Sequence, residues 1–477
     1  MRRIRFVFWV CLFLALNVFN TPVSAQQAWP EVKLEASDRI LILAPHPDDE
    51  VLGCGGIIQK AVALKLPVHI VFYTYGDNNQ WSFLVYRKHP VLVPGAVKKM
   101  GLMRHDEALA ASKALGVPAE NLTFLGYPDF GTMSIWYAHW GNRPALRSML
   151  TRVNKVPYAG ALRPGAPYKG EEIVKDLTAV LRGFRPTKIF VSHPTDHNGD
   201  HLSLYLFTRV ALWNLGEDFT PQIYPYLIHR AHWPHPKGYR PEEALVPPEP
   251  LKEEVSWFVS PLSPEEISRK EAALKAHRSQ YRSSEKYLLS FVRANELFGD
   301  FPVIKLKKSE TGESSLWPGA KEYSVQVPEE LTDSERSAFV GLEWRFVRLE
   351  GDNLVLSIEL SRPLAEGVVA SIYAFGYRSD LPFGKMPKLH VKLGVTNHSI
   401  YDQNRRLPGD TIKVVRSAKE ISISVPLAVL GDPQKILTSA RTYLSEIPLG
   451  WVAWRVLELP GQEKPLPAKN PFWFWPR

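Results

Sequence analysis

A short apolar strand that runs directly into a histidine and three acidic side chains constrains this 477-residue chain more than any other feature. The run from Ile40 to Ala44 is typical of a buried strand in a parallel sheet, and the sequence Pro45-His46-Pro47-Asp48-Asp49-Glu50 follows it. The apolar residues from Val51 to Leu64 then recur with helical spacing. Open α/β sheets place their chemistry at this position, outside the carboxyl ends of the strands.

Burying a histidine beside three carboxylates is costly unless a cation neutralises them, and this favours a divalent metal. His46 and Asp49 are three residues apart, so a chain that turns into a helix aims both side chains at one ion. Asp48 is then left to point elsewhere. The alternative is a helix cap alone, since acidic residues in a first turn suit the helix dipole. A cap, however, does not need a histidine between two prolines.

A second polar cluster follows another predicted strand, Lys188 to Ser192. It reads His193-Pro194-Thr195-Asp196-His197-Asn198-Gly199-Asp200-His201, and a predicted helix from Leu202 to Trp213 comes next. If both strands belong to one sheet, both clusters meet at the same edge. The alternative, polar loop residues that only cap a helix, does not account for this convergence.

The two motifs together resemble those of the PIG-L/LmbE-type de-N-acetylases, which carry (P/A)HPDDE and Asp-x-His-x-Asp-His. The resemblance implies a Rossmann-like, mostly parallel sheet flanked by helices over residues 38–305, and a zinc-dependent N-acetylglucosaminyl deacetylase. It also implies that His46, Asp49 and His201 hold one Zn²⁺, with Fe²⁺ as the alternative metal. Asp48 is then the expected general base for hydrolysis of an amide.

The second motif departs from the family pattern at one position. Asn198 stands where the family has a histidine that assists the reaction, and His197 lies one residue early. Either His197 reaches the same place, or Asn198 contacts the oxyanion as a neutral donor, or activity is impaired. Asp200 or Asp196 is expected to orient an imidazole.

Three further residues are candidate substrate contacts. Arg104, in a predicted helix from Met103 to Gly116, matches a family arginine that faces substrate; a surface ion pair within the helix is the alternative. Asp129 follows a predicted strand and binds sugar hydroxyls or forms a Pro-Asp turn. His229, at the end of a predicted strand, lines the site or is structural. The irregular stretch 134–170, rich in aromatic and basic residues, suits a rim that grips a glycan.

The N-terminus predicts export. Three arginines precede an apolar run from Phe6 to Leu16, and Val23-Ser24-Ala25 offers a cleavage site, as in a secretory signal peptide over residues 1–25. An uncleaved anchor is the alternative. We expect a periplasmic or extracellular protein without a stable membrane span after cleavage.

The formal charge of the chain is 58 − 49 = +9, and it falls to +6 without the three arginines of the signal peptide. This net charge does not favour nucleic-acid binding.

The rest of the chain changes character. Residues 306–320 are polar and predict a linker, and residues 321–477 contain short alternating strands separated by turns, which predicts a β-sandwich. Such a domain on an exported hydrolase suggests carbohydrate binding through Trp451, Trp454, Trp473 or Trp475. The alternative is a role in packing or assembly.

The sequence therefore predicts an exported metal-dependent hydrolase that removes N-acetyl, or other N-acyl, groups from amino sugars of a glycan or glycolipid. Two alternatives stay open. One is a metallo-hydrolase that cleaves another amide or an ester at the same site. The other is a non-catalytic glycan-binding protein with a degenerate site, which the asparagine at position 198 favours and the intact Asp48 does not.

Overall fold

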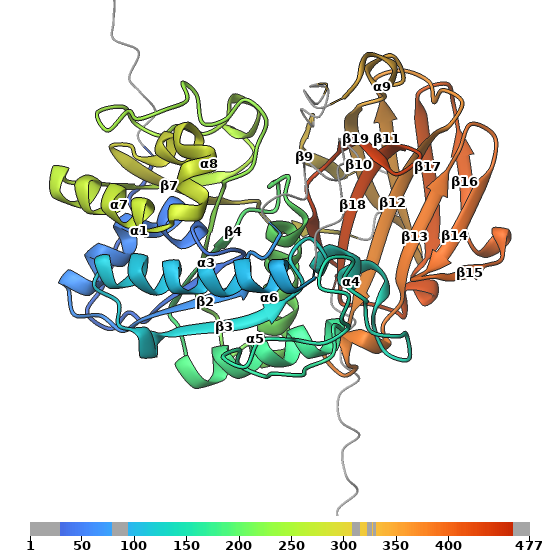
Figure 1. Cartoon of the computed structure of the whole chain (residues 1–477). Coiled ribbons are helices and arrows are strands. Elements are labelled where there is room, and N and C mark those ends of the chain that lie inside the picture. Colours follow the sequence, from blue (N-terminus) through green and yellow to red (C-terminus); the bar gives the residue numbers. More distant parts are fainter. Residues whose placement is uncertain (1–28, 79–93, 308–314, 322–326, 328–330, 461–477) are drawn as a thin grey trace, which may run out of the picture.

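The structure, a computed structural model, describes residues 29–78, 94–307, 315–321, 327 and 331–460 (Figure 1). The predicted signal peptide at 1–25 lies outside these residues, and so do Trp473 and Trp475. None of the helices in the described part is both long enough and apolar enough to cross a membrane.

The N-terminal domain is built on a mixed seven-stranded sheet in the order β3-β2-β1-β4-β5-β7-β6. The first five strands in this order are parallel to one another, β7 is antiparallel to β5, and β6 is antiparallel to β7. The strands are β1 (Ile40–Ala44), β2 (Val68–Thr74), β3 (Leu122–Tyr127), β4 (Lys188–Ser192), β5 (Gln222–Tyr226), β6 (Ser256–Pro261) and β7 (Asn295–Asp300). The predicted α/β class is thus confirmed, with a mixed sheet.

Strand order reverses between β1 and β4, which are adjacent and parallel although about 150 residues separate them in the chain. In open α/β sheets such a switch point leaves a crevice at the carboxyl ends of the strands. The two predicted motifs lie on either side of it, because each follows one of these two strands.

Helices cover the sheet, as Figure 1 shows. They are α1 (Asp49–Ala63), α3 (Pro94–Ala114), α4 (Thr132–Ala138), α5 (Gly170–Phe184), α6 (Gly199–Leu215), α7 (Pro264–Ala276) and α8 (Arg278–Leu288). Helix α1 packs closely on the sheet because its first turns are rich in glycine. A Cβ at Gly53 would lie 2.5 Å from the Tyr226 ring, so only glycine fits there. Cys54 is fully buried beside it.

The C-terminal region contains two further sheets. One has the order β16-β17-β11-β10-β9, and the other has the order β15-β14-β13-β12-β18-β20-β8, with β19 paired to β18. Buried apolar residues of both sheets form one hydrophobic cluster. The bounds are β8 (Ile304–Lys305), β9 (Ser315–Lys321), β10 (Leu342–Glu350), β11 (Asn353–Leu360), β12 (Val368–Tyr377), β13 (Lys388–Leu393), β14 (His398–Asp402), β15 (Arg405–Leu407), β16 (Lys413–Arg416), β17 (Glu420–Pro426), β18 (Lys435–Leu444), β19 (Ile447–Trp451) and β20 (Arg455–Glu458), and a short helix α9 spans Asp333–Ser337.

The structure places β9 across the end of the predicted linker, where it pairs with β10. A second difference is α4, which overlaps the start of the stretch 134–170 that the sequence predicts to be irregular. Its aromatic residues pack against the C-terminal region: Trp136 stacks on Phe375 and on Phe383, each with ring centroids 5.5 Å apart. Burial against residues more than 200 positions away in the chain stabilises this helix, which explains why local periodicity does not reveal it.

Candidate metal centre

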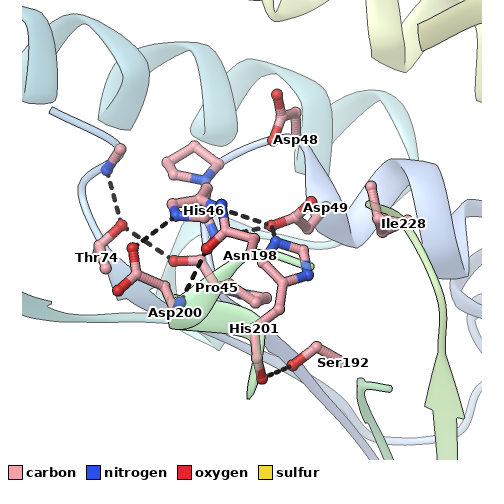
Figure 2. Close-up of polar contacts among 12 residues, drawn as sticks. Pro45, His46, Asp48, Asp49, Thr74, Ser192, Asn198, Asp200, His201 and Ile228 are labelled. Atoms are coloured by element: carbon pink, nitrogen blue, oxygen red, sulfur yellow. Dashed lines mark hydrogen bonds and ion pairs between the residues drawn. The ribbon is translucent and has the colours of Figure 1, made fainter. Parts of the chain in front are cut away.

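The loop after β1 brings His46 and Asp49 together, as Figure 2 shows. The Nδ1 atom of His46 lies 3.2 Å from Oδ2 of Asp49, and the His46 backbone N–H donates to the same oxygen at 2.9 Å. Asp48 has a φ of 128°, which turns its side chain away from this pair. The predicted geometry, with two side chains turned inward and Asp48 directed elsewhere, is thus present in the structure.

The loop after β4 completes the cluster because β4 is the neighbour of β1. The Nε2 atom of His201 lies 3.0 Å from Oδ2 of Asp49, the oxygen that also faces His46. On the other side of the ring, Nδ1 of His201 lies 3.1 Å from Oδ2 of Asp196. The sequence alone left open whether Asp196 or Asp200 orients an imidazole, and the structure places Asp196 beside His201.

Asp200 takes the equivalent position beside the other imidazole. Its Oδ2 lies 3.2 Å from Nε2 of His46 and accepts the backbone N–H of Phe130 at 2.6 Å. Its Oδ1 accepts from the hydroxyl and backbone N–H of Thr132, at the start of α4. Each imidazole of the cluster therefore has a buried carboxylate behind it, an arrangement that fixes ring orientation in metal sites.

The three candidate substrate contacts lie at different depths. Asp129 is buried, with Oδ1 3.3 Å from Nε2 of His46 and Oδ2 accepting the backbone N–H of Asn78 at 2.8 Å. His229 is half-buried, and its ring centroid lies 4.7 Å from that of His201. Ligand atoms of His46, Asp49, His201 and His229 all lie within 4.8 Å of one another. Asp129 therefore faces His46, and His229 adjoins the metal-ligand cluster.

Arg104 does not lie on a helix surface. Only 4% of it is exposed, and it donates to the carbonyl oxygens of Gly76 at 2.9 Å and Pro47 at 2.6 Å. Its Nη2 atom lies 3.3 Å from Oδ2 of Asp48. The structure thus places Arg104 against the candidate general base and the loop that carries it, rather than in the surface ion pair that was the alternative.

His197 and Asn198 are both half-buried, in the loop that leads into α6. The Asn198 side-chain oxygen caps α6 by accepting the backbone N–H of Asp200 at 2.8 Å, so the donors of its amide, on Nδ2, are not used by the cap. The His197 ring packs edge-on against Trp451 of β19, with centroids 4.4 Å apart. Both residues therefore stay candidates for the contact to the oxyanion.

Sequence reasoning assigned no role to two residues that support the first loop. Glu50 accepts the backbone N–H of Asp48 at 2.8 Å, and its other oxygen lies 2.8 Å from Nε2 of His277. All three are buried. Glu50 belongs to the motif and was visible in the sequence, whereas His277 lies 227 residues further on and carries no local signal.

Negative charge dominates the cluster. Burial opposes ionisation, yet contact with His201 and His46 holds the pKa of Asp49 well below its usual range. Burial likewise opposes protonation of His201, but Asp196 and Asp49 raise its pKa to about 9. Burial raises the pKa of Asp48 to about 6, although Arg104 acts in the opposite direction. The excess of carboxylates is the electrostatic situation that a bound cation relieves.

The donor set fits such a cation. Both ring nitrogens of His201 are buried beside carboxylates, yet neither has hydrogen-bond geometry. Two imidazoles and one carboxylate form a nitrogen and oxygen set that suits Zn²⁺, and imidazole with carboxylate also suits Fe²⁺. His46, Asp49 and His201 are therefore the residues that would hold a metal ion, with His229 beside them.

The fold and the cluster define a class: α/β proteins with a His/Asp site at the switch point of the sheet. Residues 41–212 match the family model described as PIG-L: GlcNAc-PI de-N-acetylase. This match confirms the resemblance to the PIG-L family that the two motifs indicate.

Curated proteins show similarity to part of the chain. The chain is 23% identical over 319 residues to a glucosamine-6-phosphate deaminase-like protein of Bacteroides thetaiotaomicron, covering 56% of this chain and 42% of that protein. It is 26% identical over 207 residues to a 1D-myo-inositol 2-acetamido-2-deoxy-alpha-D-glucopyranoside deacetylase of a Mycobacterium species (strain KMS), covering 43% of this chain and 54% of the other. The chain spans about half the length of these relatives.

Solved structures with a similar fold include two deacetylases. One is the N,N'-diacetylchitobiose deacetylase of Pyrococcus horikoshii, at 19% identity and a TM-score of 0.33, covering 55% of this chain and 82% of that chain. The other is the teicoplanin deacetylase Orf2 in a zinc-inhibited form, at 16% identity and a TM-score of 0.36, covering 55% of this chain and 97% of that chain.

Proposed function

We propose that this protein is a metal-dependent N-deacetylase that releases acetate from an N-acetylated amino sugar within a glycan or glycolipid. The observation that carries the proposal is the convergence of His46, Asp49 and His201 on one point. Asp48 lies next to these three residues, with its side chain turned away from them. A protein that only binds glycans has no need of a further buried carboxylate beside its metal ligands. The PIG-L domain match and the deacetylase relative support the substrate class.

The metal ion would be held by His46, Asp49 and His201. When bound there, a Zn²⁺ or Fe²⁺ ion supplies a Lewis acid that polarises the amide carbonyl and acidifies water. Two carboxylates of the chain orient the imidazole ligands. Asp196 lies against Nδ1 of the His201 ring, and Asp200 lies against Nε2 of the His46 ring, so each imidazole has a carboxylate that favours one orientation of the ring.

Asp48 is the proposed general base. Its carboxylate takes a proton from water as the water oxygen bonds to the acetyl carbon, and it passes that proton to the amine nitrogen as the C–N bond breaks. The products are acetate and a free amino sugar. A pKa of about 6 suits this role at neutral pH, because the group is ionised yet basic enough to accept a proton. Asn198 or His197 would donate to the oxyanion.

We also propose that the protein is exported to the periplasm or cell exterior, and that the two C-terminal sheets form a β-sandwich. The Arg-rich start and apolar run of residues 1–25 support export. The single hydrophobic cluster shared by the two sheets supports the sandwich. Cell fractionation, with mass spectrometry of the mature N-terminus, tests export: a chain that begins at Gln26 in the exported fraction is the expected result.

The test of the function combines metal content with acetate release from N-acetylglucosamine oligomers. Bound zinc or iron, acetate release, and its loss in Asp48→Asn with the metal retained are expected. The control is Asp410→Asn, an exposed aspartate of the C-terminal region that should change neither quantity. Bound metal without acetate from any amino sugar would favour another acyl group or a binding role. A protein that takes up no metal would overturn the proposal.

A further inference from the structure

The C-terminal region packs against the N-terminal domain and shares a hydrophobic cluster with it. Tyr373, Phe375, Phe383 and Trp454 belong to the same hydrophobic cluster as the core of the N-terminal domain. Trp136 on α4 meets Trp454 edge-on at a centroid distance of 6.0 Å, in addition to stacking on Phe375. Aromatic residues buried on this scale fix the two parts relative to each other.

Helix α4 connects this interface to the metal-ligand cluster. Its first residue, Thr132, is fully buried and bonds to Asp200, the carboxylate behind His46. One turn later, Trp136 and Tyr137 contact the C-terminal region, with Tyr137 stacked on Tyr373 at 4.7 Å. The helix is short, so its two ends cannot move independently of each other.

A second connection reaches the cluster more directly. Strand β19 ends at Trp451, which pairs with Arg441 of β18, and the Trp451 ring meets the ring of His197 at 4.4 Å and an interplanar angle of 81°. The backbone N–H of His197 donates to the carbonyl oxygen of His229 at 2.8 Å. The backbone of His197 is thus held by the N-terminal domain, and its ring is in contact with the C-terminal one.

We propose that Trp451 is a positioning residue that holds the His197 imidazole at the mouth of the metal centre, so that the C-terminal region forms part of the active site. This inference rests on the proposed deacetylase function. An edge-to-face contact restricts rotation of the imidazole and so limits the directions in which its ring nitrogens can reach a substrate oxygen. Trp454 is buried in the interface, so these two tryptophans do not form an exposed surface for stacking sugars.

The first test separates positioning from folding. In Trp451→Ala, kcat for acetate release should fall roughly 10- to 100-fold, since a small displacement of a reacting group has an effect of this size. KM should change less than about twofold. Trp451→Phe, which keeps an aromatic edge, should restore most of kcat. The control, Trp344→Ala, alters a half-buried tryptophan of β10 outside the interface and should leave kcat unchanged.

The second test asks whether Trp451 acts through His197. If it does, Trp451→Ala combined with His197→Ala should be no slower than His197→Ala alone, because the position of a missing ring has no effect. Multiplying effects would overturn the proposal. An increase in KM alone, with kcat unchanged, would also overturn it, since that would indicate a contact to the ground-state substrate.

A third measurement does not depend on activity. In the full chain labelled with 5-fluorotryptophan, the ¹⁹F signal that disappears in Trp451→Phe belongs to Trp451. That signal should shift in His197→Ala and stay unchanged in a variant of the exposed His235. If the wild type releases no acetate from any amino sugar, the proposed function fails, while this signal still decides the contact. An unchanged Trp451 signal in His197→Ala would overturn the inference by itself.

Discussion

Arg104 and Asp48 form a buried ion pair, with 3.3 Å between Nη2 and Oδ2. The same guanidinium nitrogen donates to the carbonyl oxygen of Pro47, so one side chain fixes both the charge and the backbone of the loop that carries the candidate base. Burial raises the pKa of Asp48 to about 6, and Arg104 is the strongest influence that lowers it. The arginine thus keeps this carboxylate ionised at neutral pH.

Removing this charge should shift the pH dependence of the reaction. In Arg104→Met, the pKa of Asp48 rises, so the acidic limb of kcat/KM should move to higher pH and activity at pH 7 should fall. The measurement is a pH profile of acetate release between pH 5 and 9, compared with Arg182→Met, which alters an exposed residue of α5. An unchanged acidic limb in Arg104→Met would contradict the assignment of Asp48 as base.

The carboxylate behind His46 should control metal affinity. Asp200→Asn removes the negative charge beside Nε2, and loss of such a partner typically weakens metal binding about 10- to 100-fold. Competition with a chelator of known affinity measures the effect. Asp176→Asn is the matched control, because this aspartate is equally buried but bonds to Tyr127 and Arg163. Equal metal affinities in the two variants would argue against the role given to Asp200.

Replacing a proposed ligand should abolish metal binding. His201→Ala leaves only His46 and Asp49 of the three ligands, so the purified variant should contain little metal even after zinc is supplied. Elemental analysis of the dialysed protein checks this, and chelator treatment of the wild type should remove activity that added metal restores. His235→Ala, at an exposed histidine, should keep its metal. Stoichiometric metal in His201→Ala would mean that the site lies elsewhere.

Buried histidines should make the protein less stable in acid. Burial lowers the pKa of His193 and of His390 to about 3, below the ordinary value of 6.5. The unfolded chain therefore binds protons that the folded chain does not bind. The free energy of unfolding falls as the pH falls from 6.5 towards 3. Each histidine contributes roughly 1.4 kcal/mol per pH unit within that window.

Urea unfolding at pH 7.5, 6 and 5 tests this dependence. His390→Gln should keep a hydrogen bond to Ser371 but lose its share of the slope, so that the variant resists acid better than the wild type does. The exposed His235→Gln is the control and should follow the wild type. Parallel slopes for wild type and His390→Gln would show that His390 is protonated equally in both states.

The strands that follow from short runs of apolar residues could be predicted from the sequence. The strands β1 and β4 were expected at the bounds that the structure shows, since a run of apolar and β-branched residues between polar turns is sufficient to identify them. The convergence of His46, Asp49 and His201 was predictable because parallel strands carry their loops to one edge. The metal-ligand roles of these residues are still predictions.

Residues whose partners lie far away in the chain were not predictable in this way. Asp129 and Arg104 were expected to contact substrate, which stays a prediction, but their contacts with His46 and Asp48 were not foreseen. His277 supports Glu50 across 227 residues, and nothing in the sequence around it indicates that role. Trp136 of α4 packs on residues of the C-terminal region, which no local pattern indicates. Such features depend on the completed fold rather than on sequence periodicity.

The aromatic contacts between α4 and the C-terminal region make the two halves of this chain depend on each other. Without the C-terminal region, Trp136 would lose its contacts with Phe375 and Trp454, and without the N-terminal domain these two residues would lose their contacts with Trp136. We therefore expect neither half to be soluble and stable when it is separated from the other with its present sequence. A chain that lost either half would have to replace these aromatic residues with polar ones, because a newly exposed apolar patch of this kind promotes aggregation.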